Sequence, residues 1–228
     1  MSRSLLAQEG RRRSHPTVRL VAVLSAVSVL CFGIGFRLQP SLGPVRLAGP
    51  PDGAMRLAEA RQLEEFHLQD QHGNAFDRAG LTGRWTFLVF GYSRCPDVCP
   101  LTLEVLAEAL EHLSPPPSAQ RLPGLVMVSV DGARDTPEVL ARYLDRFDSR
   151  IVGLTGDAAQ VDRLARSVAV RYAAGRSDPP GRALIDHTAL IALIDPQARL
   201  TAGFGLPYDA REIAAAFRDI AGWPAEPG

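Results

Sequence analysis

The sequence predicts an α/β domain with a central mixed sheet flanked by helices and an N-terminal β-hairpin, preceded by a single transmembrane helix. Short apolar strands alternate with amphipathic helices, and one uncharged run of 17 residues lies near the N-terminus. The 228 residues are 46% hydrophobic and 22% charged, a composition that excludes collagen-like and wholly disordered chains. This length favours one domain with attachments over two domains.

The uncharged run, residues 20–36, is at the short end of the roughly 17 to 25 residues that span a bilayer. Arg19 and Arg37 flank it and can extend their guanidinium groups to the two interfaces. A cleaved signal peptide has a shorter apolar region and a small-residue cleavage site, which the residues after Arg37 do not provide. We therefore expect an uncleaved anchor, with a signal peptide and a mitochondrial presequence as alternatives.

Charge predicts the orientation of this anchor. Five arginines precede the run and Arg37 alone follows it closely, so residues 1–19 form a cytoplasmic arm and the rest is exported. The net charge of zero divides into +5 for residues 1–40 and −5 for the remainder, and nothing suggests a nucleic-acid partner. The expected location is a bacterial inner membrane with the domain in the periplasm; the alternative is the mitochondrial inner membrane.

The exported part begins with a predicted linker at residues 37–60, rich in proline and glycine. A single domain follows at residues 61–223, near the commonest domain size, and residues 224–228 form a tail.

Within the domain, turn formers at residues 70–74 indicate a hairpin, and the apolar run at residues 85–92 indicates a strand buried on both faces. Other apolar runs predict strands and other periodic segments predict helices. The strands are expected at 125–130, 151–154, 187–194 and 200–204, and the helices at 101–113, 135–147, 158–170 and 209–220. Alternating strands and helices imply parallel βαβ units, and the closing strand, strand, helix implies an antiparallel edge. This order is expected of a thioredoxin-like domain with a hairpin and one added strand-helix unit.

Two cysteines lie where the buried strand joins the next helix, in the segment FGYSRCPDVCP (residues 90–100). A helix N-terminus stabilises negative charge, so Cys95 and Cys99 are expected to have lowered pKa values and to act as redox or metal-binding thiolates. Three cysteines are too few for a disulfide framework, and Cys31 lies within the apolar run as a small apolar residue. A structural disulfide is the alternative, although closing so short a loop stabilises little.

His187 is the histidine that the sequence favours as a third ligand. It lies in LIDHT at the start of an apolar strand, 88 residues beyond Cys99, whereas the other four histidines have solvated settings. In a thioredoxin-like fold the loop entering this strand faces the cysteine loop. Two thiolates and an imidazole suit copper, Cu(I) especially and also Cu(II), whereas zinc would usually require a fourth ligand. A buried, hydrogen-bonded histidine with no ligand role is the alternative.

Four segments carry a resemblance to a known family. They are FGYSRCPDVCPL (90–101), VSVDGARDTPEVLARYLDRF (128–147), GLTG (153–156) and DHTALIALIDP (186–196). Together they resemble the Sco/SenC family of copper-binding assembly factors for cytochrome c oxidase, over residues 61–222. The resemblance implies a thioredoxin-like fold and copper bound by Cys95, Cys99 and His187, with Asp131 near the site. It also implies a partner, the copper-accepting subunit of cytochrome c oxidase or another copper chaperone.

The function that follows is a metallochaperone for the binuclear copper centre of the oxidase, not an enzyme in the usual sense. The alternative is a thiol-disulfide oxidoreductase that uses Cys95 as nucleophile and Cys99 as resolving thiol, on a partner's cysteines or in redox signalling. A peroxidase-like redox sensor ranks third. The chain departs from the family pattern at Gly132 and Ala133, and the low aromatic content of residues 171–182 suggests that partner recognition there differs.

Overall fold

The computed structural model describes residues 53–113, 121–177, 183–187 and 189–223. The chain divides into two units, Met1–Leu47 and Ala48–Gly228, and every described residue belongs to the second. The predicted arm, the anchor at residues 20–36 with Cys31, and the tail at 224–228 lie outside the described residues. No helix among the described residues is both long enough and apolar enough to cross a bilayer.

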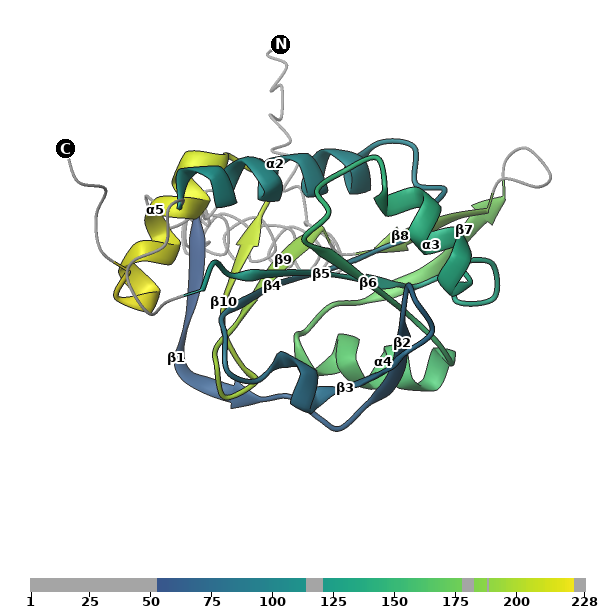
Figure 1. Cartoon of the computed structure of the whole chain (residues 1–228), viewed down its shortest axis with the longest axis horizontal. Helices are drawn as coiled ribbons and strands as arrows, with labels where there is room; N and C mark the ends of the chain where they lie inside the picture. The colour runs from purple at the N-terminus through teal and green to yellow at the C-terminus, as the bar shows by residue number, and fades with distance from the viewer. Residues whose placement is uncertain (1–52, 114–120, 178–182, 188, 224–228) are drawn as a thin grey trace, which may run out of the picture. The chain divides into compact units, whose positions relative to one another are not determined.

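A mixed sheet is the centre of the domain (Figure 1). Within the described residues it has eight strands in the order β1-β10-β9-β4-β5-β6-β2-β3, and β7 and β8 pair in a separate sheet. The strands are β1 (Ala54–Gln62), β2 (His67–Asp70), β3 (Ala75–Asp77), β4 (Thr86–Gly91), β5 (Gly124–Ser129), β6 (Ile151–Thr155), β7 (Tyr172–Ser177), β8 (Ala183–His187), β9 (Leu190–Ile194) and β10 (Arg199–Gly205). β4, β5 and β6 run parallel, whereas β9 is antiparallel to both β4 and β10.

Helices cover both faces of this sheet, as Figure 1 shows. They are the 3₁₀ helix η1 (Arg78–Leu81) and the α-helices α2 (Val98–His112), α3 (Pro137–Leu144), α4 (Ala158–Ser167) and α5 (Ala210–Ala221). Apolar residues of α2, α3 and α5 share one core with the sheet, and those of α4 share a second core with β2 and η1. Every residue of β4 and β5 is buried because helices cover both of their faces.

Side-chain caps fix where three helices begin. The Thr136 side chain accepts a hydrogen bond from Val139 N and is followed by Pro137, Asp157 caps α4, and Asp209 accepts from the first turn of α5. Gly222 ends α5 in the left-handed region, at φ 61°, where glycine carries no steric cost. These local signals determine the helix boundaries before tertiary contacts are considered.

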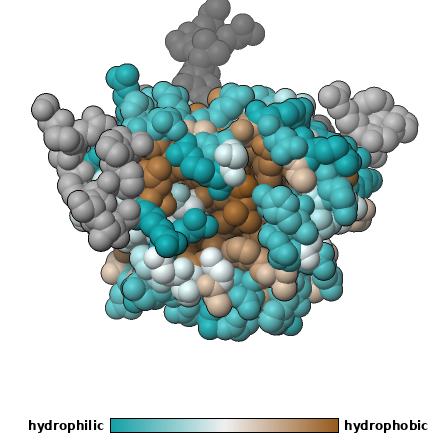
Figure 2. All heavy atoms as spheres, in the orientation of Figure 1, coloured by the Kyte–Doolittle hydropathy of each residue, from teal (hydrophilic) through white to brown (hydrophobic). Residues whose placement is uncertain are grey.

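Apolar side chains also reach the surface. In the view of Figure 2, hydrophobic residues gather in the middle of the face, below α2, with hydrophilic residues around them. Among the described residues, the large hydrophobic side chains with the greatest exposure are Met55, Leu57, Leu101 and Leu206. Of these, Leu101 lies in α2 and Leu206 directly follows β10.

Most of the predicted elements are present. The hairpin is confirmed as β2 and β3, the buried strand as β4, and the alternation of strands with helices continues through α4. The helix expected at 101–113 begins earlier, at Val98, so that Cys99 lies within its first turn. The closing β9, β10 and α5 form the predicted antiparallel edge.

Three expectations differ from the structure. Residues 54–60, expected in the linker, form most of β1, which pairs with β10 along the sheet edge. Residues 171–182, expected as a loop, contribute β7. The single strand expected at 187–194 is two strands, because residues up to His187 pair with β7 whereas Leu190 onwards pairs with β4 and β10.

Candidate metal centre

The site lies at one edge of the sheet, and strand direction explains why. β4, β5 and β10 end at this edge, where Gly91 pairs with Ser129 and Gly205 pairs with Leu190. β9 runs the opposite way, so it begins at the edge where β4 ends. The segments after β4, β5 and β10 and the segment before β9 therefore meet at one edge of the sheet.

The cysteines follow β4. Cys95 is partly exposed, Cys99 is buried in the first turn of α2, and both are thiols rather than a disulfide. The Cys95 backbone N donates to the carbonyl oxygen of Tyr92 at 3.1 Å, which turns the chain back after the strand. A Cβ atom at Gly91 would lie 2.9 Å from the Cys99 sulfur, so glycine at this position makes room for the buried thiol.

The two thiols differ in environment. A hydrogen bond with Cys95, and then burial, raise the pKa of Cys99 well above its ordinary value, although a backbone hydrogen bond with Tyr92 acts in the opposite direction. The lowered pKa expected from the helix N-terminus is therefore wrong for Cys99, because the neighbouring thiol and desolvation outweigh the helix dipole. These surroundings favour the neutral thiol of Cys99 over its thiolate.

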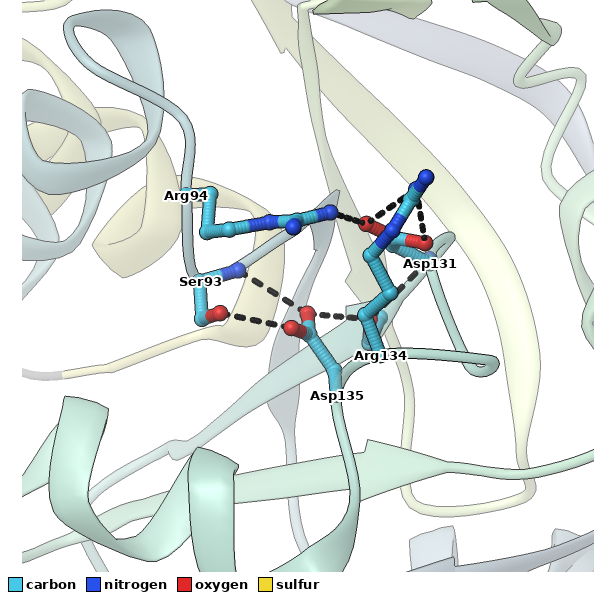
Figure 3. Close-up of polar contacts among 6 residues, drawn as sticks. Ser93, Arg94, Asp131, Arg134 and Asp135 are labelled. Carbon is cyan, nitrogen blue, oxygen red and sulfur yellow. Dashed lines mark hydrogen bonds and ion pairs between the residues drawn. The ribbon is translucent and has the colours of Figure 1, made fainter. Parts of the chain in front are cut away.

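A buried carboxylate fixes the start of the cysteine loop (Figure 3). Asp135 is fully buried and accepts hydrogen bonds from Ser93 N at 2.9 Å and from Ser93 Oγ at 2.6 Å. Ser129 Oγ at the end of β5 also donates to this carboxylate at 2.6 Å, and Thr155 Oγ1 at the end of β6 donates to the Asp135 carbonyl oxygen. One aspartate thus joins the loop after β4 to the ends of β5 and β6.

A second acidic side chain, Asp131, is buried beside the loop and neutralised by two arginines. Arg94, the residue before Cys95, donates to Asp131 at 2.6 Å, and Arg134 approaches the same carboxylate at 3.2 Å. Figure 3 shows the two guanidinium groups converging on Asp131 from the cysteine loop and from the segment after β5. Asp131 therefore reaches the site through Arg94.

Two tyrosines lie near the thiols. Burial raises the pKa of Tyr143, and the electrostatic interaction with Cys99 and Cys95 in their ionised forms adds to this effect. The Tyr143 hydroxyl is buried, with no hydrogen-bond partner among the described residues. Tyr208 lines a pocket together with Cys99, Gly91 and Ala189, and burial raises the pKa of Tyr208 to about 12. The buried thiol thus lies in largely apolar surroundings.

His187 is the last residue of β8, where its Cα pairs with that of Tyr172. Its side chain lies outside the described part of the structure. Ala189, two residues further along the chain, lines the same pocket as Cys99, so the backbone after β8 reaches the cysteine edge. The Tyr172 hydroxyl donates to Asp162, which attaches the base of the β7–β8 hairpin to α4.

The described side chains alone do not make a metal site, since no three histidine, cysteine or acidic groups among them are gathered closely enough to hold an ion. The two thiols are nevertheless in mutual contact at the end of a rigid strand. Soft sulfur ligands at this spacing fit copper better than harder cations. The pair of thiols is also suited to disulfide exchange.

Ser93, Asp135, Tyr143 and Tyr208 were not recognised from the sequence as parts of the site. Asp135 had a visible signal, an acid just before a helix with proline in its first turn, but this signal indicated a cap. The cap is Thr136, which leaves the Asp135 carboxylate for a contact 42 residues away. Its role could be found only in three dimensions.

The chain is similar in sequence to two human proteins. The chain is 36% identical over 176 residues to the human protein SCO2 homolog, mitochondrial, a match that covers 73% of this chain and 65% of that one. It is 37% identical over 152 residues to the human protein SCO1 homolog, mitochondrial, covering 66% of this chain and 50% of the relative. The chain therefore spans between half and two thirds of the length of these relatives.

Solved structures match the domain more completely. The copper-bound structure of ScoI from Bradyrhizobium japonicum has a TM-score of 0.61 at 34% identity, covering 72% of this chain and 99% of that one. Copper-bound yeast Sco1 has a TM-score of 0.64 at 31% identity, with coverages of 71% and 89%. The fold is therefore the thioredoxin-like Sco fold, with a mixed sheet and four α-helices in the described residues.

The family model SCO1/SenC matches residues 55–222, which include all of β1 after Ala54, the cysteine loop, His187 and the last helix. The match begins within the segment that the sequence had assigned to a linker, in agreement with the position of β1 in the sheet. On this match and these relatives, the chain belongs to the SCO1/SenC family.

Proposed function

We propose that this protein binds copper through Cys95, Cys99 and His187 and assists metallation of the binuclear copper centre of cytochrome c oxidase. The observation that carries the proposal is the convergence at one sheet edge. The loop after β4 carries both thiols, and β9 begins there three residues after His187. Two solved relatives with this fold are described as copper-bound.

The donor set explains why copper would be the cargo. Two thiolates and a neutral imidazole form a low-coordinate, soft site that favours Cu(I) and can also hold Cu(II). Cys95 is partly exposed, so a partner's ligand can approach the metal from the side of this sulfur. Copper can then pass by ligand exchange, as each new bond to the partner replaces one bond to the chaperone.

Anaerobic copper titration of the reduced full-length protein tests the ligand set. We expect His187→Ala to weaken copper binding by more than the roughly 10- to 100-fold that loss of a supporting residue costs. Cys95→Ser and Cys99→Ser should abolish tight binding. His72→Ala is the matched control, because His72 is an exposed turn residue, and it should bind copper like the wild type.

Unchanged copper affinity and absorption spectrum in His187→Ala would contradict the three-ligand site. The delivery step has its own test, in which copper-loaded protein is mixed with a purified copper-accepting domain of an oxidase subunit. The metal should move to the acceptor, and its retention by the loaded protein would contradict the delivery role. Loss of oxidase copper on deletion of the gene would support it.

A thiol-disulfide oxidoreductase is the second candidate, and the unequal burial of the cysteines favours it. Cys95 is partly exposed, as a nucleophile must be, whereas Cys99 is 5% exposed and suited to resolve a mixed disulfide. This function does not need His187. If His187→Ala retains full disulfide reductase activity while it loses copper, both activities belong to the cysteine pair and only one depends on the histidine.

We also propose that residues 20–36 anchor the chain in a membrane, with the domain outside the cytoplasm. The uncharged run and the arginines before it support this arrangement. Carbonate extraction of membranes from cells that express the full-length chain is the test. The protein should stay in the membrane fraction, and its release would indicate that the anchor is cleaved or peripheral.

A further inference from the structure

Two unlike surfaces flank the cysteine loop. The cationic flank consists of Arg94 and Arg134, and the apolar flank consists of Leu101 and Leu206. We propose that a partner protein docks across the loop, with carboxylates on the cationic flank and an aliphatic side chain on the apolar flank. This inference rests on the proposed function in one respect, that the cysteines exchange metal or electrons with another protein.

The cationic flank consists of two arginines that share one buried carboxylate. Asp131 is the shared ion-pair partner of Arg94 and Arg134, and its side chain is only 6% exposed. The side chains of the two arginines are 46% and 51% exposed, so each has N–H groups that face solvent. The carboxylate that they share is buried while their own N–H groups face solvent, so the exposed surface made by these two side chains is positive.

The cationic flank is opposite in sign to the net charge of the domain that carries it. Residues after position 40 have a net charge of −5, so an acidic partner is repelled by most of the exported part and attracted at the site. A guanidinium already held by Asp131 has also lost part of its rotamer freedom before the partner arrives. The remaining N–H groups can therefore bind a carboxylate at a reduced entropic cost.

The apolar flank lies on the other side of the loop. Leu101 is 48% exposed and lies one turn inside α2, and Leu206 is 54% exposed and directly follows β10. Tyr208 connects them, because it lines the pocket beside Cys99 and hydrogen-bonds to Thr102, the neighbour of Leu101. Leu101 is thus next to one residue that lines this pocket, and Leu206 lies two residues before another.

Strand order separates the two flanks. In the sequence β10-β9-β4-β5, the cysteine loop follows β4, Asp131 and Arg134 follow β5, and Leu206 follows β10. A partner that reaches Cys95 therefore contacts charge toward β5 and apolar surface toward β10. Such a two-sided face fixes the direction in which the partner lies, which a uniformly charged face does not.

The test compares two cyclic peptides, each closed by one disulfide. The first has glutamates and a leucine beside the disulfide, and the second has glutamines and a serine at the same positions. The Cys95 thiolate attacks a peptide sulfur and releases the other as a thiolate, and Cys99 then displaces the peptide dithiol. Two electrons pass to the peptide, and the protons lost by the protein thiols are taken up by the peptide thiolates.

The readout is the ratio of the two second-order rate constants, measured with the reduced full-length protein in non-ionic detergent. A small neutral disulfide, bis(2-hydroxyethyl) disulfide, reports the intrinsic reactivity of the thiols. For the wild type at low ionic strength we expect a ratio of about 10 in favour of the first peptide, within the range of electrostatic steering. The ratio should fall toward 1 in the double variant Arg94→Gln, Arg134→Gln. In roughly 0.5 M salt, the part of the wild-type ratio that depends on charge should vanish.

Leu206→Ser should lower the ratio without changing its dependence on salt. The matched controls are Arg163→Gln on α4 and Leu57→Ser on the edge strand β1, both exposed and away from the cysteine edge, and both should keep the wild-type ratio. A wild-type ratio near 1, no exchange with either peptide, or a ratio unchanged in the double arginine variant would overturn the docking face. Copper binding, measured on the same samples, separates this result from failure of the proposed function.

Discussion

The cysteine side and the histidine side of the candidate site are supported in different ways. Asp135 fixes the cysteine loop by accepting hydrogen bonds from Ser93 and Ser129. Ser93 follows β4 and Ser129 ends β5, two strands in the middle of an eight-stranded sheet. His187 ends a strand of a separate two-stranded sheet, whose base is attached to α4 through Tyr172 and Asp162. One side thus belongs to the central sheet, and the other belongs to a separate sheet of two strands. We therefore expect damage to the cysteine side to affect stability and copper binding together, and damage to the histidine side to affect copper binding alone.

Asp135→Ala should have the largest effect. It leaves Ser93 and Ser129 without their acceptor in a buried setting, and we expect the free energy of unfolding to fall by about 3 kcal/mol. Urea denaturation measures this change. Asp97→Ala is the matched control in the same loop, since Asp97 is exposed and makes no side-chain cap, and it should change stability by less than about 0.5 kcal/mol. Equal effects of the two substitutions would mean that the buried carboxylate does not hold the loop.

Gly91→Ala separates copper binding from stability on the cysteine side. The new Cβ would lie 2.9 Å from the Cys99 sulfur and 3.2 Å from the end of Met127, so the thiol must move. We expect a stability loss of about 1 to 2 kcal/mol and a larger proportional loss of copper affinity. Gly205→Ala is the control at the same sheet edge, because a Cβ there meets nothing within 4 Å. A Gly91→Ala protein that binds copper normally would show that the position of Cys99 tolerates displacement.

Tyr172→Phe tests the histidine side. It removes the hydrogen bond to Asp162, and we expect copper affinity to fall several-fold while the free energy of unfolding changes by about 1 kcal/mol or less. The thiol-disulfide exchange rate should not change, because Cys95 and Cys99 do not depend on β7. Measuring copper affinity and the exchange rate on one preparation compares the two sides directly. A parallel fall in both would contradict their independence.

The smallest expected effect concerns pH. Cys99 is a neutral thiol in the fold because the contact with Cys95 and burial raise its pKa, whereas in the unfolded chain it titrates near the reference value of 9.0. The folded state therefore retains a proton that the unfolded state loses above pH 9, and stability decreases as pH rises. When the pH is half a unit above that reference pKa, the free energy of unfolding is lower by on the order of 1 kcal/mol. Urea denaturation of the metal-free protein at pH 8 and pH 9.5 should reveal this slope, and Cys99→Ser should remove the part of it that this thiol contributes.

Local sequence patterns predicted much of the fold because its central elements have strong periodic signals. β4 and β5 are continuous apolar runs, and α4 and α5 begin at aspartate caps. β1 has no such signal. Only Ala54 of its nine residues is buried, so the strand exists through backbone pairing with β10 and its side chains show no alternation. An edge strand of this kind cannot be told from a polar linker by its side chains.

The candidate site, too, has features that the sequence predicts and features that it does not. The placement of Cys95 and Cys99 after a buried strand and at the start of a helix was predictable, because it depends only on neighbouring residues. The break between His187 and Leu190 was not, because it depends on which strands each half pairs with. Gly132 illustrates a similar limit. The sequence marks it only as a departure from the family pattern, whereas in the fold a Cβ there would lie 2.3 Å from the carbonyl oxygen of Gly156.

The reversed direction of β9 has a consequence for how the protein is made. It brings the end of β8 to the cysteine edge only after the chain has passed through β5, β6 and α4, since His187 lies 88 residues beyond Cys99. A contact between such distant residues is closed late in folding, because the entropy of the intervening loop must first be overcome. A chain still being synthesised thus presents two thiols but no third ligand. The complete copper site that we propose would then be acquired only by finished molecules, and capture of the metal would report that folding is over.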